Sequence, residues 1–140
     1  MASSGIFPEE MLKSSSSGSS FTLESIAGKL HYFQAQIKFI HWRTKNNSEH
    51  VALGNLFDYL VEKTDVIIEQ LMGYEGKTIT GFKIDQIDGK MGHMEAVRAL
   101  EKYAHEIYEF GEDKMYCGVE LNSQKLSAMC AKTLYLLTQE

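Results

Sequence analysis

The feature that most constrains this chain is an eighteen-residue stretch, GYEGKTITGFKIDQIDGK (residues 73–90), which lacks helical periodicity. It is rich in glycine and aspartate, and it is longer than most connections between packed helices. On each side of it lies a pair of helical segments joined by a short link. This short, long, short pattern of connections predicts an all-α fold with four helices packed as a bundle.

The four segments are defined by apolar residues spaced three and four apart. We expect the first helix from Thr22 to about Lys45, and the second from the cluster at 46–48 to about Met72, where Gly73 and Gly76 should stop it. The third should run from about Gly92 to Phe110, with Gly111 and Gly118 bracketing the next turn. The fourth should run from about Leu121 to Leu137.

The connection lengths limit the topology. The two short links force antiparallel neighbours, whereas the long link reaches along a helix of about 24 residues, which is about 36 Å at 1.5 Å per residue. A single long crossover between the second and third helices is the arrangement of ferritin-like bundles. A simple up-down-up-down bundle stays open as an alternative, because a long loop can also fold back on itself.

Composition divides the chain into two parts. Residues 21–140 have the size and apolar content of one domain, whereas residues 1–20 contain the run SSSSGSS and should form a flexible tail. Four apolar residues of the tail could dock on a neighbouring subunit or a partner protein; they are Ile6, Phe7, Met11 and Leu12.

The charge and the cysteines limit partners and location. The net charge is -5, which disfavours binding to nucleic acid or anionic membrane. We see no segment long enough to span a bilayer and no secretory leader, so we expect a cytoplasmic protein. Cys117 and Cys130 should be reduced and are expected to be buried, although pairing stays open.

Imidazoles and carboxylates suited to iron, manganese or zinc surround the first short link. His41 falls on the inner face of the first helix, and His50 opens the second helix nine residues later. Four carboxylates then form one stripe along the second helix at spacings of four, three and four: Asp58, Glu62, Asp65 and Glu69.

Each of these features has a simpler interpretation. An acidic stripe at helical spacing is more often a solvated face than a metal site, and a single histidine more often donates to a backbone carbonyl than binds metal. We expect His31 and His93 to be ordinary surface or hydrogen-bonded residues. The combination of two histidines with the Asp65–Glu69 pair favours a metal site more than either part alone.

The stretch IHWRTKNNSEHVALGNLFDYLVEKTDVIIEQLMGYEG resembles the Dps-like miniferritins, with their His-Trp, His, Asp-x-x-x-Glu and glycine turn. The resemblance implies an inter-subunit ferroxidase site, with His41 and His50 from one chain, Asp65 and Glu69 from its two-fold partner, and Trp42 alongside. It further implies Fe(II) oxidation by peroxide or oxygen and iron storage in a homododecamer.

The chain departs from the family pattern at two points. Gly54 stands where the family has an aspartate ligand, and the interval between the histidines is three residues shorter. A mononuclear iron site, or a site for another divalent metal, is therefore also considered. Asp58 could replace the missing carboxylate only if it faces the site.

Two further expectations follow. DNA binding relies on lysine-rich tails in the resembling family, and this tail has one lysine, so we expect none. The alternative function is a non-catalytic ferritin-like bundle that acts as a structural or interaction protein, for example in virion assembly.

Overall fold

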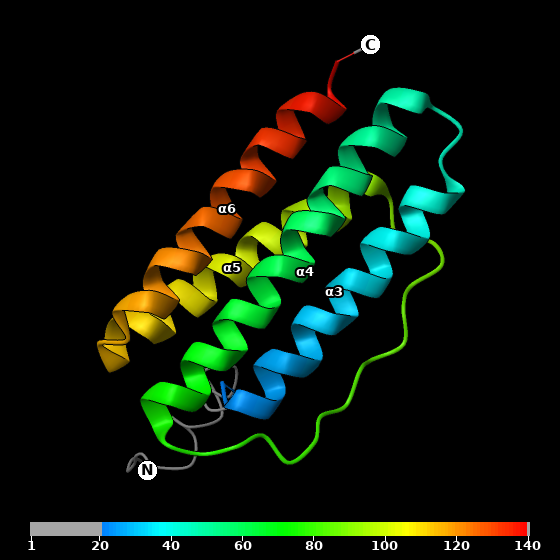
Figure 1. The fold of residues 1–140 in the computed structure, drawn as a ribbon. Helices are drawn as coiled ribbons and strands as arrows, with labels where there is room; N and C mark the ends of the chain where they lie inside the picture. Colours follow the sequence, from blue (N-terminus) through cyan, green and yellow to red (C-terminus); the bar gives the residue numbers. More distant parts are fainter. Residues whose placement is uncertain (1–20, 140) are drawn as a thin grey trace, which may run out of the picture.

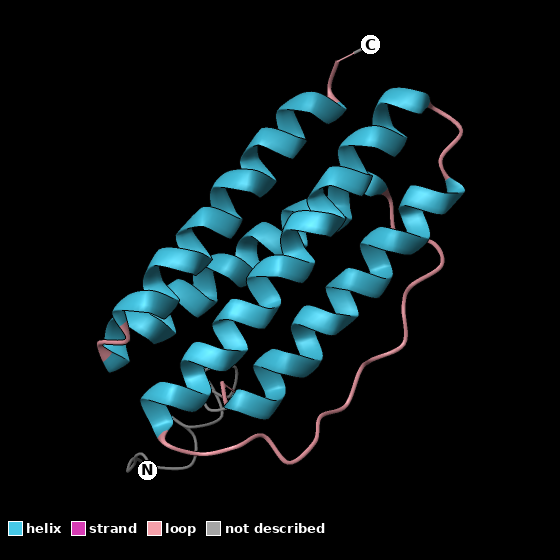
Figure 2. Cartoon of the chain, in the orientation of Figure 1, coloured by secondary structure: helices cyan, strands magenta, loops and turns pink. Residues whose placement is uncertain are grey.

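A computed structural model describes residues 21–139 of the protein and contains four α-helices. They are α3 (Leu23–Arg43), α4 (Asn47–Glu75), α5 (His93–Lys114) and α6 (Cys117–Leu137). The described residues contain no strand, so the predicted all-α four-helix bundle is confirmed (Figure 2). The tail predicted to be flexible, residues 1–20, lies outside the described residues.

Local chemistry sets the helix ends. Thr22 and Ser25 form a capping box at the start of α3, and Asn46 accepts a hydrogen bond from the Glu49 backbone N–H at the start of α4. At the other end of α4, Gly76 adopts a left-handed conformation with φ of 65° and terminates the helix.

The helices form a closed ring of neighbours: α3 packs on α4, α4 on α6 and α6 on α5, with a thinner contact between α5 and α3 (Figure 1). Apolar residues spaced three and four apart on each helix fill the core between them. Fully buried members include Leu23, Ile26, Leu30, Ile37, Leu53, Leu56, Leu60, Ile67, Leu71, Leu100, Ile107 and Leu126.

The connection between α4 and α5, residues 77–92, is here called the strap. It runs beside α3 toward the start of α5 (Figure 1). Gly28 faces the backbone of Lys83, and the Gln36 amide exchanges two hydrogen bonds with the Asp88 backbone at 3.0 and 2.7 Å. Arg43, at the end of α3, donates to carbonyl oxygens of the last part of the strap. Successive parts of the strap therefore meet successive turns of α3.

Two helix ends differ from the prediction because two glycines lie inside helices. Gly111 does not end α5, which continues to Lys114, and Gly118 lies in the first turn of α6. A β-carbon at Gly111 would lie 3.2 Å from the backbone nitrogen of Glu120. This glycine therefore serves close packing of α5 on α6, and Met115, at φ 64°, ends the helix.

Gly73 also lies within a helix, because α4 continues past the predicted end at Met72 to Glu75.

The cysteine prediction was half right. Both thiols are free, but Cys117 is exposed and only Cys130 is buried. Between residues 21 and 139, no helix is long and apolar enough to cross a membrane.

Candidate metal centre

His41 and His50 form a reciprocal pair that we call the histidine clasp. His41 lies in the last turn of α3 and His50 in the first turn of α4, and three residues separate the helices. Nδ1 of His41 donates to the His50 carbonyl oxygen at 2.7 Å, and Nδ1 of His50 donates to the His41 carbonyl oxygen at 2.9 Å. The two rings stack with centroids 3.8 Å apart and planes 19° apart.

These hydrogen bonds fix the tautomer of each neutral ring. A carbonyl oxygen only accepts, so each Nδ1 must carry the proton, and each Nε2 of a neutral ring keeps its lone pair. Among residues 21–139 neither Nε2 has a hydrogen-bond partner. Both rings are half-buried. The clasp therefore holds two Nε2 atoms that could bind metal, each on a ring whose Nδ1 is already hydrogen-bonded.

The space for the clasp comes from Gly54, one turn into α4 from His50. A β-carbon built at this position would lie 2.9 Å from Cε1 and 3.2 Å from Nδ1 of His41. The absence of a side chain at residue 54 thus allows the His41 ring to lie against the α4 backbone. The position expected to supply a carboxylate instead supplies room for an imidazole.

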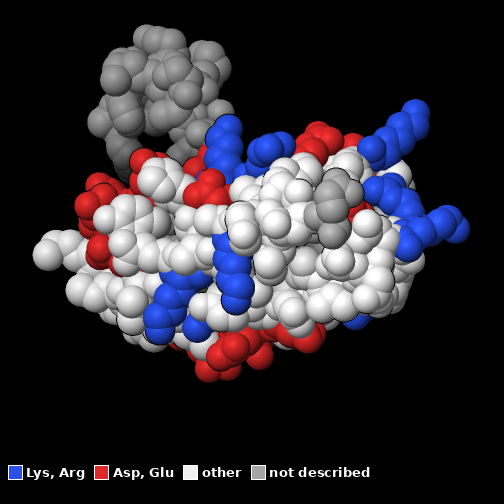
Figure 3. Space-filling view, turned by 90° about the horizontal axis from the view of Figure 1, so that it is seen from above, with Lys and Arg blue, Asp and Glu red and all other residues white. Residues whose placement is uncertain are grey.

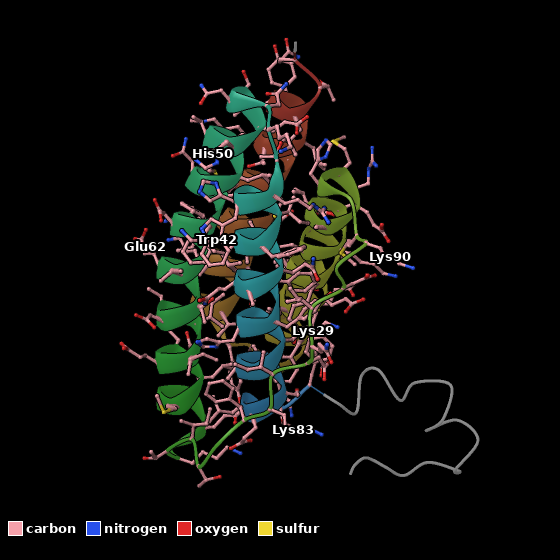
Figure 4. All side chains as sticks on the ribbon, turned by 90° about the vertical axis from the view of Figure 1, so that its right-hand side faces the viewer. Lys29, Trp42, His50, Glu62, Lys83 and Lys90 are labelled. Atoms are coloured by element: carbon pink, nitrogen blue, oxygen red, sulfur yellow. The ribbon has the colours of Figure 1, made fainter. Side chains whose placement is uncertain are left out.

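Trp42, beside the clasp, is 70% exposed. Lys38 extends over this side of the hairpin, with Nζ 4.4 Å from the Phe57 ring centroid and 5.9 Å from the Trp42 centroid. Figure 4 shows Trp42 and His50 on the same side of the bundle, with Glu62 farther along α4. The clasp thus adjoins an exposed aromatic side chain.

The four carboxylates of the predicted stripe, Asp58, Glu62, Asp65 and Glu69, are all exposed on α4. At 1.5 Å per residue, Asp65 lies about 22 Å along α4 from His50, and Glu69 lies still farther away. The structure therefore brings the histidines together but separates them from the Asp65–Glu69 pair within one chain. Accordingly, residues 21–139 contain no cluster of three or more potential metal-ligating side chains.

Sequence reasoning missed a polar network next to the clasp. Thr44 donates to Glu49 at 2.7 Å, and the other Glu49 oxygen lies 3.6 Å from Nε2 of His93. Arg43 donates to the Gly89 and Met91 carbonyl oxygens at 2.6 and 2.7 Å. These contacts join the α3–α4 turn to the end of the strap and the start of α5, and no local sequence pattern signals them.

The remaining histidines have ordinary environments. His31 donates through Nδ1 to the Ala27 carbonyl at 2.8 Å and stacks on Phe82. His105 lies 3.4 Å from Glu109 on an exposed face of α5.

The fold and the clasp together define an all-α four-helix bundle with a paired-imidazole junction between its first two helices. Residues 41–137 match the model of a family described as "Family of unknown function (DUF5856)", and the chain belongs to that family. The matched region begins at His41 and includes the whole of α4, α5 and α6. No curated protein and no solved structure gives a significant match.

Proposed function

We propose that this protein binds Fe(II) and promotes its oxidation at a site formed between two subunits, as a cytoplasmic iron-storing or iron-detoxifying protein. His41 and His50 of one chain would act with Asp65 and Glu69 of a partner chain. The observation that carries the proposal is the engagement of both Nδ1 atoms by backbone carbonyls. Histidines that bind metal commonly donate their other ring N–H in this way, which holds the ring and raises the basicity of the ligand nitrogen.

The ring geometry favours two metal positions over one. An imidazole lone pair lies in the plane of its ring, and metal–nitrogen bonds are about 2.0–2.1 Å long. The ring centroids lie 3.8 Å apart and the planes are only 19° from parallel, so the two planes meet well beyond that bond length. One ion therefore cannot lie in both planes while the clasp is intact, so each histidine would serve its own position.

A second chain is needed to complete either position. Within residues 21–139 the exposed acidic stripe has no hydrogen-bond or ion-pair partner across the bundle, and the clasp has no carboxylate at Gly54. An antiparallel pairing of two α3–α4 hairpins would place the clasp end of one against the acidic stripe of the other. The exposed Trp42 beside the clasp supplies apolar area to such an interface. The resemblance to miniferritins extends this pairing to a dodecamer.

The donor types suit iron. Neutral imidazole together with carboxylate is a common ligand set for iron, and it also accepts zinc and manganese. Iron would be the substrate and the stored material. The residues of the chain would bind the iron and hold its position, and the carboxylates of Asp65 and Glu69 would offset its positive charge.

A second candidate function is a non-catalytic bundle that acts as a structural or interaction protein. Two observations favour it. The two Nδ1 hydrogen bonds and the ring stacking hold the clasp together by themselves, and the His41 ring fills the space that a ligand side chain at Gly54 would need. In this function the clasp closes the α3–α4 hairpin, and Trp42 with the acidic stripe forms a protein contact.

DNA binding is not part of the proposal. The face in Figure 3 carries acidic side chains at the left and along the lower edge and basic ones in the centre and at the right, and the chain as a whole has a net charge of -5. Counterion release from a phosphate backbone requires clustered cations. A gel shift at moderate salt should show no retention.

The decisive experiment is anaerobic addition of Fe(II) followed by oxygen or peroxide. We expect His41→Ala and Asp65→Ala to slow oxidation at least tenfold. Glu62→Ala is the matched control, because Glu62 is equally acidic and exposed on the same stripe but lies outside the proposed ligand set. Equal rates in all four proteins would support the non-catalytic bundle.

Mixed assembly tests the inter-subunit part of the proposal. A dimer with one His41→Ala chain and one Asp65→Ala chain retains one complete site, so oxidation should recover when the two variants are unfolded and refolded together. Two copies of one variant should stay inactive. A monomer in light scattering, or no recovery on mixing, would contradict a shared site.

A further inference from the structure

A groove of about 810 Å³ lies at the start of α3, between α3, the strap and α5. Gly28 contributes no side chain to it, and its apolar lining is aromatic. Phe82, on the strap, is 45% exposed, and the Phe21 ring is half-buried. Lys29 and Lys83 flank the groove on α3 and on the strap (Figure 4). Tyr103 completes the aromatic lining, and the groove is also lined by three carboxylates, those of Glu24, Asp85 and Glu106.

The position of the groove points to its occupant. Phe21 is both a lining residue and the first described residue, so the twenty residues that precede it leave directly from the edge of the groove. Any apolar group on that segment is tethered beside an exposed aromatic surface. A ligand held by a short flexible linker has an effective concentration in the millimolar range, at which weak contacts suffice.

The segment has a matching composition. Residues 6–12, IFPEEML, carry four large apolar side chains and two adjacent glutamates. The apolar side chains suit the aromatic lining. The charges of the lining are mixed, with Glu24, Asp85 and Glu106 beside Lys29 and Lys83, so the apolar contacts and the tether carry the argument. Residues 14–20, SSSSGSS, contain no apolar side chain and would serve as the linker in such docking. The apolar and acidic groups are therefore confined to one short stretch.

The linker has the right length. Seven residues of glycine and serine span about 15 Å on average, at roughly 5–6 Å multiplied by the square root of their number. The groove extends along α3 from Phe21 to Lys29, which is about 12 Å at 1.5 Å per residue. The linker can thus return residues 6–12 to the groove without stretching.

We propose that residues 6–12 dock in this groove of their own chain. The proposal goes beyond iron chemistry and is independent of the histidine clasp. The docked segment would cover the exposed Phe82 ring and lie across the place where the strap crosses α3. It would therefore hold the strap against the bundle.

Trypsin cleavage after Lys13 tests the proposal in the full chain, because Lys13 is the sole trypsin site among residues 1–20. A docked segment resists cleavage, since proteases need an extended, unbound stretch. We expect Phe7→Ser, which leaves the bundle untouched, and Phe82→Ser, which alters the groove, each to raise the cleavage rate about tenfold. Tyr135→Ser is the matched control, because Tyr135 is 63% exposed on α6, away from the groove.

Two results would overturn the proposal. One is cleavage of the unmodified chain as fast as that of Phe7→Ser. The other is protection that grows with protein concentration, which would assign the groove to the segment of a second copy. Protection that is independent of concentration and is lost in both variants supports docking within one chain.

Discussion

The imidazole of His41 occupies the space that a side chain at residue 54 would need, since a β-carbon built on Gly54 would approach its Cε1 to 2.9 Å. Gly54→Ala should therefore displace the ring and break the bond from Nδ1 to the His50 carbonyl. The cost of overpacking and of the lost hydrogen bond is about 2–3 kcal/mol. It exceeds the gain of about 1 kcal/mol in helix propensity.

Gly73→Ala is the matched control on the same helix, because a β-carbon at Gly73 meets nothing within 4 Å. It should stabilise the protein by about 0.5–1 kcal/mol. Urea denaturation of both variants measures the contrast. Equal stabilisation by the two substitutions would show that the clasp contributes nothing to folding.

Gly28→Ala should loosen the strap. A β-carbon at this position would overlap the backbone carbonyl oxygen of Lys83, and a backbone group cannot rotate away as a side-chain tip can. We expect a loss of about 1–3 kcal/mol in unfolding free energy, as is usual for overpacking. Amide exchange should accelerate at Asp88, whose N–H donates to Gln36, and stay unchanged in the middle of α6; uniform acceleration would contradict a local effect.

Gln36→Leu should weaken the same strap through lost hydrogen bonds. Gln36 is fully buried. Its amide nitrogen donates to the Asp88 carbonyl oxygen, and its amide oxygen accepts from the Asp88 N–H. We expect destabilisation of about 1–2 kcal/mol. Gln34→Leu, two residues away on α3 at a half-buried position, should change stability by less than about 0.5 kcal/mol. Thermal unfolding of both variants checks the difference.

Cys130 should make the protein sensitive to alkali. Burial, with a smaller contribution from Glu101, raises the pKa of its thiol from 9.0 to about 12. Between these values the unfolded chain releases a proton that the folded chain keeps, so stability is complete below pH 9 and falls as pH rises toward 12. The slope contributed by this group is at most about 1.4 kcal/mol per pH unit.

Denaturation curves between pH 8 and 11 measure this slope. Cys130→Ala should flatten the decline, while a remainder persists because burial also raises the pKa of Tyr103. Cys117→Ala is the control, since the Cys117 thiol is exposed. Parallel curves for the three proteins would contradict the assignment to Cys130.

Much of the fold follows from local sequence, because helical periodicity and burial reinforce each other. The apolar positions of α3 illustrate this, because the residues that fall at helical spacing are all buried: Leu23, Ile26, Leu30, Phe33, Ile37 and Ile40. Glycines were harder to interpret. Gly76 ends a helix and Gly111 does not. Gly111 is a glycine because α6 packs closely against it, and its own local sequence does not indicate that contact.

The candidate site was only partly predictable. Spacing placed His41 on the inner face of its helix, and carbonyl donation was one interpretation of it. That His50 returns the same hydrogen bond depends on the angle between two helices, which no local pattern encodes. The Arg43 contacts with the strap could not be predicted from a local pattern either, because 46 and 48 residues separate the partners.

The strap has a consequence for how the molecule opens. Among the described residues, its stretch 78–87 makes no backbone–backbone hydrogen bond. This stretch contacts α3 at Gly28 and through the stacking of His31 on Phe82, and hydrogen bonds from Gln36 and Arg43 hold the residues that follow it. Such a segment constitutes a local unfolding unit, whose opening free energy is set by a few contacts and not by the core. The strap can therefore detach from α3 while all four helices stay folded.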